Sequence, residues 1–308
     1  MIEYNSKVWL RHVFDFHKID TFRALFPEMI LVAGYTAVIV LLERYFSETW
    51  TDVDLLRSLG SITTMHSLLG FIISMLLVFR TNSAYERWWE ARKHWGALVN
   101  ASRNLAIKLR AFLGETPPAE REYLAGAIGD FPVALKDHLR GAVRPAALEQ
   151  FHAAPTAEAN ALPVPQQIVL ALYHRMQGYS ARGALAGEKL LVIDRDLAAL
   201  VDILGACERI RNTPIPYSYN IFIKKFIFFY IATLPIGFAA LFHYWAIPLI
   251  SFLFYVLVSL EVIAEEIEDP FGTDPNDLPT DRLAEMIRRN VRDILCPDGG
   301  GETREAGR

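Results

Sequence analysis

Long runs of apolar residues without charge dominate the hydrophobic pattern of the chain. Residues 58–79 and 226–260 contain no Asp, Glu, Lys or Arg, and residues 29–42 form a shorter run of the same kind. A helix needs about 20 mostly apolar residues to cross a hydrocarbon core of about 30 Å. The pattern therefore predicts membrane-spanning helices at residues 26–46 and 58–80. Taken alone, the shortest run is also compatible with a buried core helix, but its apolar neighbours favour a tilted membrane helix.

The run at residues 226–260 is too long for one ordinary span. It contains Pro235 and Pro248, and the polar and aromatic sequence His243-Tyr244-Trp245 lies near its middle. Backbone that faces lipid must keep its hydrogen bonds inside helices. We therefore expect a helical hairpin with spans at residues 226–242 and 245–263, which brings the predicted number of spans to four.

The distribution of basic residues predicts the orientation of these spans. The first loop is rich in acids, whereas basic residues follow the second span and precede the third: Arg80, Arg87, Arg92, Lys93, Arg103, Lys108, Arg110, Lys224 and Lys225. Loops on the cytoplasmic side carry an excess of Lys and Arg. The sequence thus predicts a cytoplasmic N-terminal helix (1–25), a cytoplasmic central region (81–225) and a cytoplasmic C-terminal segment (264–308).

The central region has the periodicity of helices. Apolar and aromatic residues recur at helical spacing after the second span and continue to about Gly114. Further helices are predicted at about 118–142, 165–182 and 189–211, and no stretch alternates as a strand does. The predicted fold class is an all-α membrane protein with a large helical cytoplasmic region.

Composition narrows the classes of function. Hydrophobic residues make up 52% of the chain, charged residues 21%, and the mean hydropathy is +0.21. The formal net charge of -4 gives no basic surface for nucleic acid. Two distant cysteines, Cys207 and Cys296, exclude a disulfide framework, and the N-terminus lacks the pattern of a cleaved signal peptide. Hydrolase, phosphate-binding and Cys/His metal motifs are absent from the sequence, so we expect no enzyme.

Four segments together resemble the bestrophin family, and in particular its bacterial branch. They are WLRHVFDFH (Trp9 to His17), GFIISMLLVFRTNSAYERWWEARKHWG (Gly70 to Gly96), GACERIRNTPIPYSY (Gly205 to Tyr219) and EEIEDPFGTDPNDLP (Glu265 to Pro279). The resemblance implies a homopentameric ion channel of the bacterial inner membrane, in which the second spans surround the pore. It implies monovalent ions and membrane lipid as the partners.

Two candidate pore sites follow from matched positions. Phe71, Met75 and Phe79 share one helix face, and the resemblance implies that they form the apolar pore neck. From the residues alone, that face favours packing against another helix or contact with lipid. Glu188 matches the cytoplasmic constriction, where five carboxylates about 6 Å apart would repel by roughly 3 kcal/mol per neighbouring pair and disfavour anions. The alternative for Glu188 is a solvated glutamate in a first helical turn.

The last segment resembles a calcium clasp. Asp274 and Asp277 match the two side-chain ligands, and the carbonyls of Trp9, Glu266 and Asp269 match the backbone ligands. Such oxygen donors suit Ca²⁺, which takes six to eight of them. The same sequence is also an ordinary turn.

The leading hypothesis is a passive channel for small monovalent ions, with no cofactor required and Ca²⁺ as the one candidate ligand. Glu188 tilts the expected selectivity slightly toward cations such as Na⁺, and chloride stays open. A non-conducting scaffold, a transporter and a membrane-embedded enzyme are the alternatives.

Overall fold

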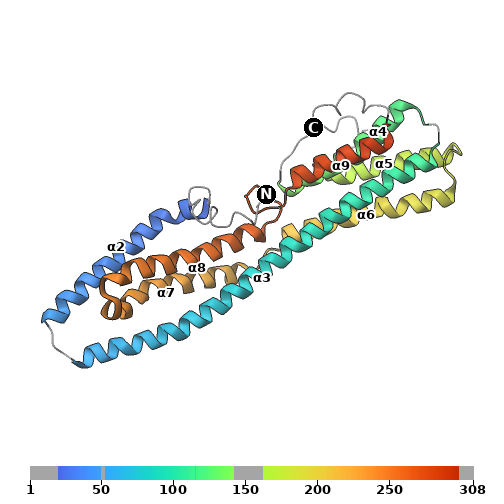
Figure 1. Cartoon of the computed structure of the whole chain (residues 1–308). Coiled ribbons are helices and arrows are strands. Elements are labelled where there is room, and N and C mark those ends of the chain that lie inside the picture. Colours follow the sequence, from blue (N-terminus) through green and yellow to red (C-terminus); the bar gives the residue numbers. More distant parts are fainter. Residues whose placement is uncertain (1–19, 50–52, 115, 142–161, 298–308) are drawn as a thin grey trace, which may run out of the picture. The chain divides into compact units, whose positions relative to one another are not determined.

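The computed structural model describes residues 20–49, 53–114, 116–141 and 162–297, and these residues form helices joined by turns (Figure 1). The all-α prediction is confirmed for them. The elements are α2 (Asp20–Thr49), α3 (Val53–Phe112), α4 (Pro118–Leu139), α5 (Val164–Ala181), α6 (Gly187–Asn212), α7 (Tyr217–Phe242), η5 (His243–Trp245), α8 (Ala246–Glu268) and α9 (Thr280–Leu295).

The chain divides into two compact units. The first comprises Met1–Arg87 and Pro214–Asp269, and the second comprises Trp88–Thr213 and Pro270–Arg308. The first unit therefore extends beyond the predicted spans, which end at residue 80, begin again at residue 226 and end at residue 263. One cause is a contact past the apolar run, where Arg87 Nε donates to the Glu268 carbonyl at 3.2 Å and ties this turn of α3 to the end of α8.

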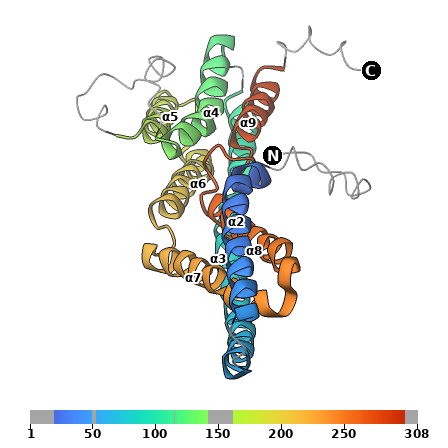
Figure 2. The same cartoon turned by 90° about the vertical axis from the view of Figure 1, so that its left-hand side faces the viewer.

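The first unit contains α2, the first part of α3, and the α7–α8 hairpin. Three stretches among the described residues are long and apolar enough to cross a membrane: Thr21–Phe46, Ile62–Phe112 and Tyr217–Glu268. The third contains both hairpin helices, which η5 separates at the polar break that the sequence predicts (Figure 2). His243 takes a φ of 45° there, so the chain reverses without a glycine.

Close approach of α3 and α7 depends on small residues. A Cβ added at Gly70 would lie 2.8 Å from the Tyr230 hydroxyl, and one added at Gly237 would lie 3.3 Å from Ile62. His66 Nε2 also lies 3.0 Å from Thr233 Oγ1 across the same contact. Small residues and polar side chains at helix contacts are typical of membrane proteins, where lipid removes the hydrophobic drive between helices.

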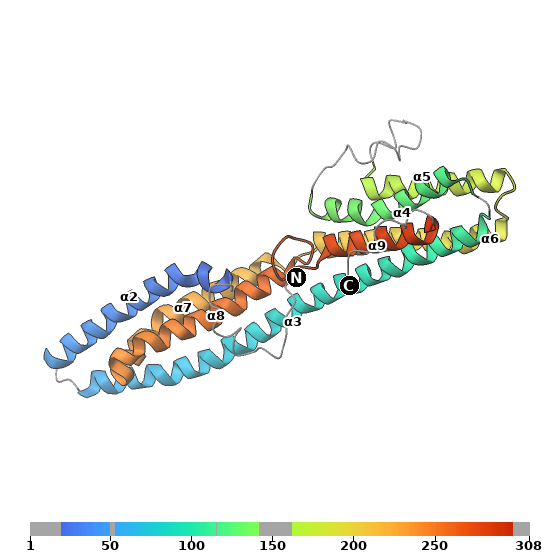
Figure 3. The same ribbon diagram turned by 45° about the horizontal axis from the view of Figure 1, so that its top comes forward.

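The second unit packs α4, α5, α6 and α9 with the later part of α3 (Figure 3). Prolines precede the first turns of α4 and α5, where a missing N–H costs no helical bond. The bounds of α4, α5 and α6 lie within three residues of the predicted helices. The core of the second unit contains the fully buried side chains of Trp95, Phe131 and Leu135. Trp95 therefore belongs to a helical core and not to a membrane interface.

Candidate functional site: the apolar face of α3 and its ionic anchor

The predicted neck residues lie on an exposed face of α3. Phe71, Met75 and Phe79 are 68%, 50% and 52% exposed in the single chain. Residues four apart on a helix stand one above another, so the three form a continuous apolar stripe. Leu68 and Val78 are exposed as well, so the uncovered surface is wider than the stripe. In the membrane this apolar surface therefore contacts lipid, packs against another chain or lines a pore.

The opposite face of α3 is buried in the first unit. Ile73 and Leu77 are 1% and 2% exposed and belong to its apolar core. Two hydroxyls of this part of the helix bond back to the preceding turn, since Ser74 Oγ donates to the Gly70 carbonyl and Thr81 Oγ1 donates to the Leu77 carbonyl. The packing of one face thus fixes which residues the other face presents.

An ionic cluster begins at the residue after Phe79. The Arg80 side chain is fully buried, its Nη2 lies 2.7 Å from Glu268 Oε2, and its Nε lies 3.6 Å from Glu261 Oε2. Glu261 and Glu268 come from α8, and both are buried. A charge is taken out of water only at high cost unless it is paired. The cluster therefore anchors α3 to α8 directly beside the predicted neck.

Glu268 extends this anchor to the start of α7. Its Oε1 accepts a hydrogen bond from the backbone N–H of Ile215 at 2.8 Å. The connection before α7, which two prolines stiffen, is thereby tied to the same carboxylate that holds Arg80. One glutamate links three segments of the first unit.

Glu188 lies in the first turn of α6 in the second unit, and its side chain is exposed. A carboxylate at this position is stabilised by the helix dipole, as the simpler interpretation of the sequence expects. Leu191, one turn later, is 74% exposed, so the start of α6 presents a charged and an apolar residue together. The geometry of one chain is compatible with both interpretations of Glu188.

The segment that resembles a calcium clasp forms a turn. Asp277 is buried, its Oδ2 accepts the backbone N–H of Asp274 at 2.6 Å, and its own N–H donates to the Asp274 carbonyl at 3.1 Å. The Asp274 side chain is exposed. Trp9 lies outside the described residues, and among those described no three acidic, His or Cys side chains gather as a metal site would need. Calcium binding therefore stays a prediction.

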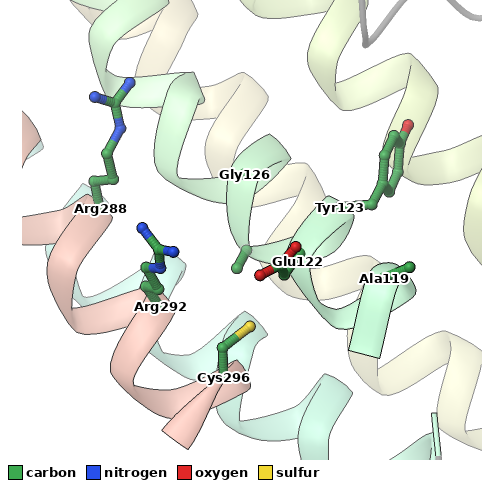
Figure 4. A pocket seen from close by; sticks show the side chains of 8 residues that line it. Ala119, Glu122, Tyr123, Gly126, Arg288, Arg292 and Cys296 are labelled. Carbon is green, nitrogen blue, oxygen red and sulfur yellow. The ribbon is translucent and has the colours of Figure 1, made fainter. Parts of the chain in front are cut away.

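A cavity of about 460 Å³ lies between α4 and α9 in the second unit. Figure 4 shows the Glu122 carboxylate and the Arg292 guanidinium directed into it from the two helices, with the Cys296 thiol nearby. Burial raises the pKa of Cys296, and Glu122 raises it further, against the opposing effect of Arg292 and Arg121. The thiol therefore stays protonated at neutral pH and is a poor nucleophile.

Comparison with known families decides the class of the protein. The family model described as "Bacterial/Fungal Bestrophin protein" matches residues 1–293, which is nearly the whole chain. The chain belongs to the bacterial bestrophin family. The resemblance inferred from four sequence segments is thereby confirmed.

Curated relatives of this bestrophin have names that state an activity. A "voltage-dependent anion channel-forming protein" of Nostoc sp. strain PCC 7120 is 36% identical over 232 residues, covering 73% of this chain and 75% of its own. YneE of Escherichia coli K12, which has the same description, is 30% identical over 292 residues and covers 93% and 91%. The family is one of channel-forming proteins and not of enzymes, as predicted.

Solved structures agree with the fold. The bacterial bestrophin homologue of Klebsiella pneumoniae superimposes with a TM-score of 0.77 at 27% identity, covering 88% of this chain and 98% of that one. The chain is thus an all-α membrane protein with the bestrophin fold.

The ionic cluster was missed by the sequence analysis, although its residues were in view. Arg80 ends one uncharged run and Glu261 ends another, and Arg80 also counts among the basic residues that predict the orientation. Two opposite charges at the ends of long apolar runs are a signal for pairing, because both are held at the edge of a water-poor region. The partner of Arg80 at 2.7 Å, Glu268, has no such signal in the sequence.

Proposed function

We propose that the chain assembles as a homopentamer that conducts small monovalent ions across the bacterial inner membrane. The observation that carries this proposal is the exposed apolar stripe of Phe71, Met75 and Phe79 on a helix whose opposite face is buried. Five copies of this stripe around an axis would form three apolar rings, a constriction that opens and closes by dewetting. The family's channel-forming relatives support the same conclusion.

The proposed topology has four spans, at residues 26–46, 58–80, 226–242 and 245–263, with both termini in the cytoplasm. The excess of Lys and Arg outside these spans on one side supports this arrangement. α7 and α8 are separate helices joined at η5, which supports two spans in the longest apolar run.

The charge preference of the pore has two candidates. The names of the curated relatives favour anions and do not support the slight lean toward cations that the sequence suggested. A ring of five Glu188 carboxylates favours cations, because a ring of negative charge attracts them and repels anions. The side chain of Glu188 is exposed and near the start of α6, where it is free to face an axis or bulk water.

Recording in a planar lipid bilayer tests the proposal. Purified protein should give unitary currents, and its mass in detergent should correspond to five subunits of 34.9 kDa. A reversal potential under a salt gradient assigns the charge preference. Glu188→Gln should shift that potential toward greater anion permeability, with Glu285→Gln, an exposed glutamate of α9, as the matched control. Folded monomers without current would refute the channel, and an unchanged potential in Glu188→Gln would place this glutamate away from the pore.

A further inference from the structure

An apolar groove runs along the surface of the first unit between α2 and α7. It has a volume of about 480 Å³, and α8 contributes Phe254 to its wall. The buried residues Val32, Ile227 and Ile231 form its floor. Leu31 and Phe228, which are 72% and 66% exposed, form its two rims. The groove is therefore a lined cleft on the apolar surface of the first unit, and not a flat helix face.

A contact between the two helices marks one end of the groove. The hydroxyl of Tyr35 donates to the Ala232 carbonyl at 2.8 Å and bridges the two helices. Glu28 lies at the other end, seven residues earlier on α2, which corresponds to about 10 Å of helix rise. Half of a hydrocarbon core is about 15 Å thick, so the groove runs through most of one leaflet.

Two opposite charges lie toward the other end of the groove. α2 and α7 run parallel, because Glu28 shares the groove with Ile227 while Tyr35 meets Ala232 farther along both helices. Lys225 is not one of the residues that line the groove, but it precedes the lining residue Ala232 by seven residues and so lies on the same face of α7, toward the end of the groove at Glu28. Both side chains are exposed, and the described contacts include no ion pair of either with another residue.

We propose that this groove binds one acyl chain of a phospholipid whose headgroup carries both an ammonium and a phosphate, as phosphatidylethanolamine does. The chain fills the apolar groove up to the Tyr35 bridge, the ammonium pairs with Glu28, and the phosphate pairs with Lys225. An anionic headgroup without an ammonium, as in phosphatidylglycerol, would meet Lys225 but be repelled by Glu28. These two charges therefore select the headgroup, while the groove selects a chain.

Native mass spectrometry of the detergent-purified protein tests this site with equal amounts of the two phospholipids added. The wild type should retain phosphatidylethanolamine in preference to phosphatidylglycerol. Glu28→Gln should reduce that preference by about fivefold, and Lys225→Gln should weaken the retention of both lipids by a similar factor. Glu28→Gln keeps the shape of the side chain, and Lys225→Gln removes the charge of a residue outside the lining, so both test the headgroup contacts without refilling the groove.

A second pair of variants tests the groove itself. Leu31→Trp should fill it and abolish the retained lipid, whereas Leu41→Trp, at an exposed residue of α2 outside the groove, should not. Equal retention in wild type and Leu31→Trp overturns the proposal. The proposal is also overturned if Leu31→Trp changes the number of subunits and leaves the amount of bound lipid unchanged, because the groove would then be an interface between copies of the chain. Equal retention of both lipids with no effect of Glu28→Gln also overturns it.

Discussion

At the scale of single residues, Arg80 is the most consequential side chain that the structure reveals. Its guanidinium is fully buried and is shared by two carboxylates of α8. Removing one partner of a buried pair costs more than the pair itself contributes, because an uncompensated charge stays in a water-poor site. Because Arg80 directly follows Phe79 in α3, loss of its ion pairs would also disturb the predicted neck.

We therefore expect Arg80→Met to destabilise the protein by about 3–5 kcal/mol. Lys224→Met, which breaks the exposed pair with Glu265, should cost no more than about 1 kcal/mol. Thermal unfolding in detergent, followed by circular dichroism, compares the two. Equal melting temperatures for both variants would show that the Arg80 cluster is not an anchor.

The turn at Asp274 and Asp277 allows a sharper test of calcium than the sequence suggested. Asp277→Ala would loosen the turn with or without calcium, because its carboxylate accepts the Asp274 N–H. Asp274 takes part in that bond through its backbone and keeps it in Asp274→Ala. If calcium binds, wild type should gain thermal stability in millimolar Ca²⁺ and Asp274→Ala should gain less. An equal response of both proteins would leave the segment as a turn alone.

At the scale of elements, α3 presents two faces with opposite roles. Met75→Ala should widen the apolar constriction and raise the open probability, because a shorter side chain lowers the barrier to wetting. Ile73→Ala, on the buried face, should instead cost about 2–5 kcal/mol of stability through the cavity it leaves. Single-channel recording and thermal unfolding separate these effects. An unchanged current in Met75→Ala would show that the stripe packs against a neighbour or lipid and does not form the pore neck.

At the scale of the whole molecule, the orientation in the membrane is testable with the native cysteines. Cys207 is fully buried, and burial, with smaller effects of Glu208 and Glu90, raises its pKa to about 12, so it should not react at neutral pH. In a Cys296→Ser background, Trp245→Cys at η5 should react with an impermeant maleimide added outside intact cells. Leu191→Cys of α6 should react only after lysis. Labelling of Leu191→Cys from outside would refute the proposed topology.

Local pattern was sufficient for much of this protein. The uncharged runs, the break at His243 and the prolines before α4, α5 and α7 locate the helices along the chain, because hydrophobic period and proline act on neighbouring residues. The bounds of α4, α5 and α6 agree with the predicted helices within three residues, whereas α2 begins six residues and α7 nine residues before the corresponding predicted spans. Four short segments were enough to recognise the family. The stripe of Phe71, Met75 and Phe79 also follows from helical spacing, since residues four apart share a face in any helix.

Contacts between residues far apart in the sequence could not be predicted from local pattern. Arg80 meets Glu268, Tyr35 meets Ala232, and Asp277 turns its carboxylate inward to its own turn. Each depends on how helices far apart in sequence pack or on how a turn closes, and a periodic pattern carries no information on which faces meet. The exposed face of α3 and the groove between α2 and α7 exist for the same reason: packing covers one side of each helix and leaves the other for a partner.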